Sequence, residues 1–409
     1  MPRRRNDEGR QFGGGAHSPK RALRPGRRVL ESKGGIPHMK KMKKTLALIL
    51  VVAMLSIGLA ACGDKEGGSS DLNVAVFYYT YSDTYISSVR TALDKALTDK
   101  GITYKNYDCN GDQGTQNNGI QTALAEGANL LVVNLVNSGA PDAAKAIIDM
   151  AGDVPVIFFN RAVDSVDNPD ANLKANDNIC FIGTDAPEAG HLQGKMIGDY
   201  LLEHYDEVDL NGDGVIQYAM FKGDEANVEA IYRTQYGQED ADAVLTAAGK
   251  PAMEFFDSAN TSKYQVDLTG QWSSQAAVDY MNTNLAQFNE ANNNMIELVI
   301  CNNDGMAEGV ISALNAAGYN TGSGKTIPVF GVDATDSAKQ LIAEGKMTGT
   351  VKQDAEGMAT AIAETASSIG GGSNVSEAVA KAAEGGDIFS IAEGVANKLY
   401  VAYAPYTGA

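Results

Sequence analysis

The sequence has few of the residues from which catalytic and zinc sites are usually built. It holds four histidines, and after residue 61 only His191 and His204 remain. Two histidines leave little material for a His-based catalytic system or a zinc site. The chain also lacks a nucleophile elbow, a P-loop and the glycine fingerprint of dinucleotide binding. We therefore predict that the protein is not an enzyme.

Cysteine is scarce as well. One of the four cysteines, Cys62, follows an apolar run near the N-terminus, and the other three are Cys109, Cys180 and Cys301. No CxxC pair occurs among them, and Cys180 and Cys301 lie in apolar segments typical of strands. We therefore predict buried free thiols and no metal or redox site.

Basic residues become scarce after residue 61. Residues 62–409 carry 19 Lys and Arg against 48 Asp and Glu, a net charge of −29. This charge repels phosphate groups, so it argues against nucleic acid and anionic lipid as partners and predicts a soluble surface. The length of this part suits two domains rather than one.

The first 61 residues have the composition of a disordered leader followed by a signal peptide. Residues 1–38 are rich in Arg, Gly and Pro and have no apolar periodicity. Met39 precedes a lysine cluster, and an apolar run from Leu46 to Ala61 follows it. This order is typical of a secretory signal. Because such a signal normally stands at the N-terminus, Met39 is an alternative to Met1 as the true start.

A lipid attachment site is predicted at the end of that apolar run. Leu59-Ala60-Ala61-Cys62 resembles the lipobox of bacterial lipoproteins, in which the cysteine becomes the lipidated N-terminus. Residues 62–70 are rich in Gly, Ser and charge, and we expect a flexible tether there. The sequence thus predicts an extracytoplasmic protein that meets the cell membrane only through its lipid anchor.

The segment Asp209–Gln217 has the ligand spacing of an EF-hand calcium loop. Oxygen-bearing side chains occupy its first, third, fifth and ninth positions, and a glycine stands at the sixth. The twelfth position is Met220, which cannot supply the usual bidentate carboxylate, and the residues after the loop predict a strand. We therefore expect a calcium loop whose last ligand comes from a distant part of the chain. The alternative is a simple turn rich in Asn, Asp and Gly.

Short apolar segments alternate with amphipathic ones from Asn73 onward. Strands are expected at Val74–Phe77, Thr103–Tyr107, Leu131–Val133, Val154–Phe159, Ile179–Ile182, Val215–Phe221, Met253–Phe256, Leu298–Ile300 and Pro328–Phe330. Helices are expected at Tyr85–Lys100, Ala140–Met150, Glu188–His204, Val228–Ala247, Ser274–Phe288 and Met306–Ala316, and a further helix is expected after the strand at Thr103–Tyr107, ending at Ala125. Strands this apolar are typical of parallel sheets covered on both faces. The pattern predicts two doubly wound α/β domains.

Polar side chains follow several of these strands. Tyr81–Tyr85 follows the first strand, Asn160 and Arg161 follow Phe159, Asn302–Asp304 follows Cys301, and Asp333 follows the strand at Phe330. Ligands bind at the carboxyl ends of strands in such sheets. Side chains of this kind can form the planar hydrogen bonds that replace water around sugar hydroxyls, although each alone is more often a cap or a turn. Trp272, the only tryptophan, could stack on a pyranose ring or simply pack at a helix start.

From about Asn73 to the C-terminus the chain resembles the periplasmic-type solute-binding proteins of ABC sugar importers, specifically the galactose/glucose-binding group. The best match is the calcium loop together with the segment from Ile296 to Asp304. The resemblance implies a periplasmic binding protein type I fold and a structural Ca²⁺. The implied metal ligands are Asp209, Asn211, Asp213, the Val215 carbonyl, Gln217 and Glu297.

The same resemblance implies a sugar site. Asp83 and Asn160 would bind hydroxyls from the first domain, and Tyr85 would stack on the ring. Three positions depart from the family pattern, which has His, Asp and Asn where this chain has Asn227, Glu229 and Gln353, so the exact sugar is left open. The full set of implied ligand-binding residues is Asp83, Tyr85, Asn160, Asn227, Glu229, Arg233, Trp272, Asn303, Asp333 and Gln353.

The resemblance also implies the domain boundaries and the partners. Three hinge crossings are expected, near Thr184-Asp185, Gln353-Asp354 and Val401-Ala402. One sugar-binding lobe would comprise residues 71–184 and 354–401, and the other, with the calcium loop, residues 185–353 and 402–409. The implied partners are a monosaccharide, an ABC importer permease and a chemoreceptor for chemotaxis, with the protein itself a monomer.

Three alternatives remain. A LacI-type effector domain shares the fold but needs a helix-turn-helix where this chain has a secretion signal. A secreted calcium-dependent carbohydrate hydrolase could use Asp83, Glu229 or Asp333 as paired carboxylates. A binding protein for another monosaccharide, such as xylose or ribose, is the nearest alternative, and the calcium loop argues against it.

Overall fold

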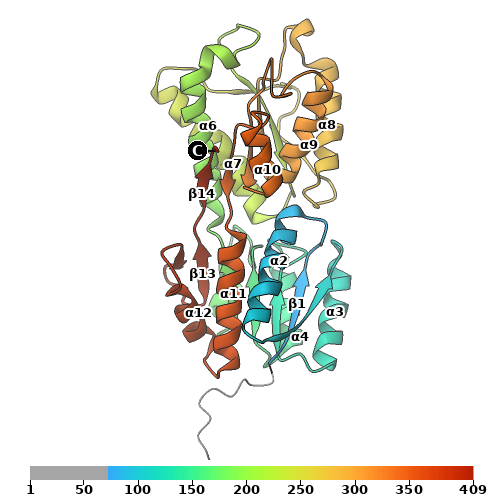
Figure 1. The fold of residues 1–409 in the computed structure, drawn as a ribbon, viewed down its shortest axis with the longest axis vertical. Coiled ribbons are helices and arrows are strands. Elements are labelled where there is room, and N and C mark those ends of the chain that lie inside the picture. The colour runs from blue at the N-terminus through green and yellow to red at the C-terminus, as the bar shows by residue number, and fades with distance from the viewer. Residues whose placement is uncertain (1–71, 409) are drawn as a thin grey trace, which may run out of the picture. The chain divides into compact units, whose positions relative to one another are not determined.

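The computed structural model describes residues 72–408, and they form two α/β lobes (Figure 1). The first 71 residues, including the predicted leader, Cys62 and most of the tether, lie outside the described part, as does Ala409. In residues 72–408 no helix is long and apolar enough to cross a membrane.

The first lobe is built on a seven-stranded sheet of order β12-β13-β5-β4-β3-β1-β2. Every neighbouring pair is parallel except β12 with β13. The strands are β1 (Asn73–Tyr78), β2 (Thr103–Asp108), β3 (Leu130–Val133), β4 (Val156–Phe159), β5 (Ile179–Gly183), β12 (Phe389–Ile391) and β13 (Lys398–Val401). The helices are α2 (Thr84–Asp99), α3 (Gln113–Ala125), α4 (Pro141–Ala151), α5 (Ala171–Ala175), α11 (Ala355–Gly370) and α12 (Val375–Ala383).

The second lobe is built on a sheet of order β14-β11-β10-β9-β6-β7, with the short β8 also paired to β6. Only β14 runs antiparallel to its neighbour. The strands are β6 (Gln217–Lys222), β7 (Glu254–Phe255), β8 (Gln265–Val266), β9 (Leu298–Cys301), β10 (Val329–Asp333), β11 (Gly349–Lys352) and β14 (Ala404–Tyr406). The helices are α6 (Ala186–Val208), α7 (Val228–Ala247), α8 (Ser274–Gln287), the 3-10 turn η1 (Glu290–Asn292), α9 (Asp304–Ala316) and α10 (Asp336–Ala343).

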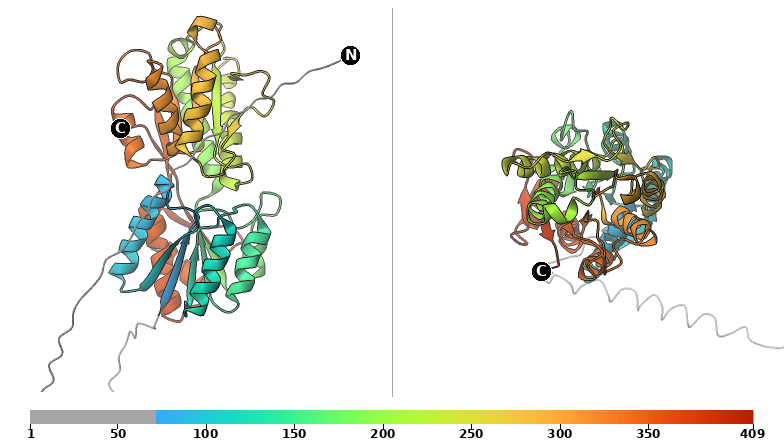
Figure 2. Two further views of the ribbon diagram at one scale, coloured as in Figure 1. Left: turned by 90° about the vertical axis from the view of Figure 1, so that its right-hand side faces the viewer. Right: turned by 90° about the horizontal axis from the view of Figure 1, so that it is seen from above.

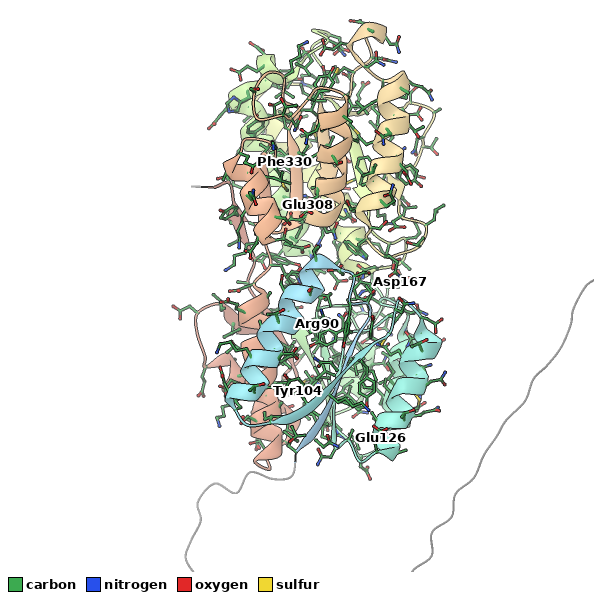
Figure 3. The ribbon with its side chains drawn as sticks, turned by 45° about the vertical axis from the view of Figure 1, so that its right-hand side comes forward. Arg90, Tyr104, Glu126, Asp167, Glu308 and Phe330 are labelled. Carbon is green, nitrogen blue, oxygen red and sulfur yellow. The ribbon has the colours of Figure 1, made fainter. Side chains whose placement is uncertain are left out.

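Both sheets are covered on both faces, as the apolar strands predict. All residues of β3, β4 and β5, whose side chains alternate between the two faces, are buried. Helix α11 packs between α2 and α12, while α3 packs with α4 (Figures 1 and 2). In the second lobe α6 packs against α7, and α8 against α9. The labelled Phe330 on β10 is one of the largest fully buried side chains of that lobe (Figure 3).

The helices follow from their apolar periodicity and their caps. In α2 the side chains of Ile86, Val89, Leu93 and Leu97 form the buried stripe that the sequence predicts. The Asp83 carboxylate accepts a hydrogen bond from the Ile86 N–H and so caps the first turn. Helix α7 occupies the residues predicted for it.

The sequence periodicity fails where a helix has no polar face. It predicts no element after Phe330, whereas the structure continues with α10, β11, α11, α12 and β12–β14. Helix α11 shows the reason, since nine of its sixteen residues are buried and most of these are Ala, Gly, Ser or Thr. The short α5 and β8 are also unpredicted, and β6 begins at Gln217 rather than at Val215.

The chain passes from one sheet to the other three times. The crossings lie after β5 at residues 184–185, after β11 at residues 353–354 and after β13 at residues 402–403. The predicted fold class, two α/β domains with mostly parallel sheets and three crossings, is confirmed. Parallel strands of both sheets end near these crossings, which brings the polar residues after the strands together.

Candidate ligand-binding site

One pocket, with a volume of about 40 Å³, is lined by residues of both lobes. All ten residues that the sequence assigns to ligand binding line this pocket: Asp83, Tyr85, Asn160, Asn227, Glu229, Arg233, Trp272, Asn303, Asp333 and Gln353. The structure shows that these residues lie together, and the contact that each would make with a ligand stays a prediction.

Three of the polar residues are also helix N-caps. Asp83, Asn227 and Asn303 each use one side-chain oxygen to accept the N–H three residues further on, at the start of α2, α7 and α9. A cap holds the side chain in one orientation, so the other polar atom of each residue has a fixed direction. In Asp83 the second oxygen accepts a 2.6 Å hydrogen bond from the Tyr79 hydroxyl.

Backbone strain is concentrated around the pocket. Asn160, Trp272 and Asp333 have positive φ angles of 62°, 57° and 125°, and Ala334 has a φ of 54°. Non-glycine residues rarely adopt this region, and such strain is typical of functional sites. The Trp272 ring rests on Gly223, where a Cβ atom would lie 2.1 Å from the indole. Only glycine lets the ring approach the end of β6 so closely.

Arg233 is the centre of a buried polar network. Its guanidinium donates to the Asn302 carbonyl (2.9 Å), to the Tyr403 hydroxyl (3.0 Å) and to Gln353 Oε1 (3.3 Å). It lies 4.0 Å from a carboxylate oxygen of Asp333. Arg233 therefore connects α7 to the ends of β9 and β11 and to the third crossing.

Several carboxyl groups around this arginine are removed from water. Burial raises the pKa of Asp333 well above its usual range, and the Arg233 guanidinium opposes the rise. Burial likewise raises the pKa of Glu229. Behind the pocket, burial raises the pKa of Asp304 to about 7, although Thr350 Oγ1 and the Thr335 N–H donate to its carboxylate. Additional donors from a ligand would stabilise the ionised forms in the pocket.

Three buried polar atoms of the pocket have no hydrogen-bond partner within residues 72–408. They are Glu229 Oε2, Arg233 Nε and Gln353 Nε2. Unpartnered buried polar atoms are rare and costly, so their presence in one pocket indicates that a polar ligand completes them.

Three further lining residues, Tyr79, Ile86 and Arg161, have no predicted role in binding. The Arg161 guanidinium lies 4.1 Å from the centre of the Tyr79 ring and donates to the carbonyls of Leu135 and Val136. Its position after β4, next to Asn160, was the available signal, but the sequence does not show the stacking on Tyr79.

The predicted calcium loop joins α6 to β6. The Asp209 carboxylate accepts the N–H groups of Gly212 (2.7 Å), Asp213 (3.1 Å) and Gly214 (2.9 Å), which curls the loop around it. The distant Glu297 is fully buried beside the loop, and its two oxygens accept the N–H groups of Asn211 (3.0 Å) and Gln217 (3.1 Å).

The donor set fits a hard cation in kind. Asp209, Asp213 and Glu297 have no Lys or Arg ion pair in the described part of the chain. Burial raises the pKa of Glu297 to about 7, and the Asp209 charge adds to the effect. Even so, no three carboxylate, imidazole or thiolate groups of residues 72–408 converge closely enough to hold a metal by themselves. The amide oxygens of Asn211 and Gln217 and the Val215 carbonyl would have to complete the coordination.

All three described cysteines are buried and free, as predicted.

The raised pKa of Asp304 predicts a pH dependence of stability. Between the unfolded pKa of 3.8 and about 7, Asp304 keeps its proton in the folded protein and loses it in the unfolded chain. The free energy of unfolding therefore falls as the pH rises through this window. Asp304→Asn should remove this loss, which is on the order of 4 kcal/mol at about 1.36 kcal/mol per pKa unit. Urea unfolding at pH 5 and pH 8 should show that the free energy of unfolding of the variant, relative to the wild type, is higher at pH 8 than at pH 5. An equal difference at both pH values would contradict the assignment.

Comparison with known proteins places this fold and pocket in a family. A family model described as periplasmic binding protein domain matches residues 74–373. The chain is 32% identical over 340 residues to the D-galactose/methyl-galactoside binding periplasmic protein MglB of Haemophilus influenzae, which covers 82% of this chain and 92% of that protein. It is 27% identical over 317 residues to a putative rhizopine-binding protein of Rhizobium meliloti, covering 77% and 87%.

A solved structure supports the fold. An ABC transporter solute binding protein from Bacillus halodurans with bound myo-inositol aligns with a TM-score of 0.58 at 21% identity, covering 84% of this chain and 96% of that one. Together with the match over residues 74–373, these similarities show that the chain belongs to the periplasmic binding protein family.

Proposed function

We propose that the protein is an extracytoplasmic binding protein that captures a hexose of the galactose or glucose type and delivers it to an ABC importer. The observation that carries the proposal is the set of three unpartnered buried atoms, on Glu229, Arg233 and Gln353, in a pocket lined by both lobes. The relative from Haemophilus influenzae, named for D-galactose and methyl-galactoside, supports this ligand class.

The residues of the pocket can bind a pyranose without any chemical step. Tyr85 and Trp272 line the pocket from different lobes and would cover the apolar C–H faces of the ring. The carboxylates of Asp83 and Asp333 would accept hydrogen bonds from hydroxyls, and Arg233 would donate one. Such charge-assisted bonds discriminate between epimers because a wrong hydroxyl leaves a buried group unpaired.

Binding of a hexose should be visible in the fluorescence of the only tryptophan. We expect glucose or galactose to change the Trp272 emission and to raise the melting temperature. Asp83→Asn keeps the capping oxygen but loses the charge, so it should weaken binding by about 1.5–3 kcal/mol, roughly ten- to hundredfold in Kd. Titration calorimetry measures this difference.

Asp108→Asn, on β2 and outside the pocket, is the matched control and should leave Kd unchanged. If neither sugar changes the emission or the melting temperature at millimolar concentration while xylose or ribose does, the hexose assignment is wrong and the alternative monosaccharide takes its place. Asn227, Glu229 and Gln353 are then the first positions to vary.

We propose in addition that the Asp209–Gln217 loop and Glu297 hold a structural Ca²⁺. The support is a loop curled around Asp209 and three carboxylates without a basic partner in residues 72–408. A bound cation would compensate these charges and fix α6 to β6 and β9. None of its residues lines the ligand pocket, so we expect it to serve stability rather than ligand contact.

Calcium removal should therefore lower stability more than it lowers sugar affinity. A site filled at one hundred times its Kd adds about 2.7 kcal/mol to the free energy of unfolding, so a chelator should lower the melting temperature by roughly 5 °C or more. Glu297→Gln should abolish this response, whereas Glu203→Gln, on an exposed part of α6, should keep it. A wild-type melting temperature that the chelator leaves unmoved would rule out the site.

We also propose that Cys62 carries a lipid anchor and that residues 62–70 tether the lobes to the membrane. The lipobox-like sequence before Cys62 supports this, and both segments lie outside the described residues. Cys62→Ala should release a soluble product into the medium, because the tether offers no other anchor. Detergent-phase partitioning that persists in this variant would show that another segment holds the protein.

A further inference from the structure

A second and larger cavity adjoins the ligand pocket. We call it the hinge chamber, and residues that line it include Ser165, Phe181, Asp185, Glu229, Tyr232 and Tyr400. Its volume is about 200 Å³, against about 40 Å³ for the ligand pocket. Its walls come from the loop after β4, the first crossing, the start of α7 and β13, so both lobes contribute.

Glu229 forms the partition between the two spaces, because it is the one residue that lines both of them. Its Oε1 accepts the Ala162 N–H at 3.1 Å, which joins α7 of the second lobe to the loop after β4 of the first. Its Oε2 has no partner in the described residues, and the side chain is only 4% exposed. Glu229 thus borders both spaces and carries an acceptor oxygen that nothing in residues 72–408 satisfies.

The lining of the hinge chamber suits an uncharged unit rich in hydroxyls. Tyr232, Tyr400 and Phe181 give it an aromatic lining. The Lys398 ammonium lies 5.1 Å from the centre of the Tyr400 ring and 5.7 Å from that of Phe181, and Tyr232 stacks on Tyr236, so a sugar ring would use the faces that these partners leave. Lys398 is already paired with Asp170 at 2.6 Å. The Asp185 carboxyl group makes no capping hydrogen bond to α6 within residues 72–408, so it can bind a hydroxyl. Four acidic residues against one lysine oppose an anionic occupant.

We propose that the hinge chamber receives the second sugar unit of a disaccharide whose first unit is the hexose in the ligand pocket. The inference rests on the proposed function, since it extends the same site. The second ring lies beside Tyr232 and Tyr400, and the glycosidic link passes Glu229, whose free oxygen accepts a hydroxyl next to the link. Closure of the lobes then encloses both units.

The test compares a monosaccharide with disaccharides on matched variants. Titration calorimetry is run with glucose, galactose, lactose, melibiose, maltose and cellobiose. Ser165→Trp places a large side chain in the hinge chamber without touching the ligand pocket. Asp167→Trp adds the same side chain two residues along the same loop, at an exposed position that does not line the chamber (Figure 3).

We expect the wild type to bind the hexose and at least one disaccharide that contains it, with Kd values within tenfold of each other. Ser165→Trp should weaken the disaccharide at least tenfold and change the hexose less than twofold, whereas Asp167→Trp should change neither. Hexose binding also shows that each variant is folded.

The outcomes separate the two proposals. If the wild type binds hexose but no disaccharide, the chamber assignment is overturned while the proposed function stands. Equal weakening of hexose and disaccharide by Ser165→Trp also overturns it, because the loop then acts on lobe closure alone. If no sugar binds, the proposed function itself is wrong.

Discussion

The buried, hydrogen-bonded guanidinium of Arg233 is the constraint on which the binding region depends. A guanidinium that is 3% exposed must find partners for its donors inside the protein, and its two terminal nitrogens do so with Asn302, Gln353 and Tyr403, while Nε has no partner in residues 72–408. These partners come from the ends of two strands and from the third crossing, so one side chain sets the relative positions of segments far apart in the sequence. It also opposes the rise that burial causes in the pKa of Asp333. A ligand therefore meets polar groups that are already oriented.

Part of this region could be predicted from local rules of sequence, whereas Asn227, Glu229, Arg233 and Gln353 are predicted only through the resemblance to sugar-binding proteins. The strands are apolar enough to be recognised, and helix N-caps such as Asp83, Asn227 and Asn303 stand where a strand has ended and a helix begins. Parallel sheets bring those ends together, so residues read separately along the chain converge in one pocket. The positive φ angles of Asn160, Trp272 and Asp333 add the rigidity that such a pocket needs.

Other features depend on contacts that no local pattern encodes. The stacking of Arg161 on Tyr79 joins residues more than eighty positions apart, and the Ala162–Glu229 hydrogen bond joins the two lobes. The family resemblance predicts Glu229 as a ligand contact, but only the structure shows that its Oε1 accepts a hydrogen bond from the other lobe. Helix α11 escapes detection for a different reason, since a helix buried on most sides lacks the polar face that periodicity requires.

The three thiols of the lobes have a practical consequence. Cys109, Cys180 and Cys301 are at most 1% exposed, and burial raises the pKa of each, so the reactive thiolate is suppressed. A maleimide dye will therefore ignore them in the folded protein. A cysteine introduced at an exposed position such as Asp167 then becomes the single reactive thiol of residues 72–408. A polarity-sensitive dye attached there would report lobe closure as a change in fluorescence. No native cysteine of the lobes has to be removed.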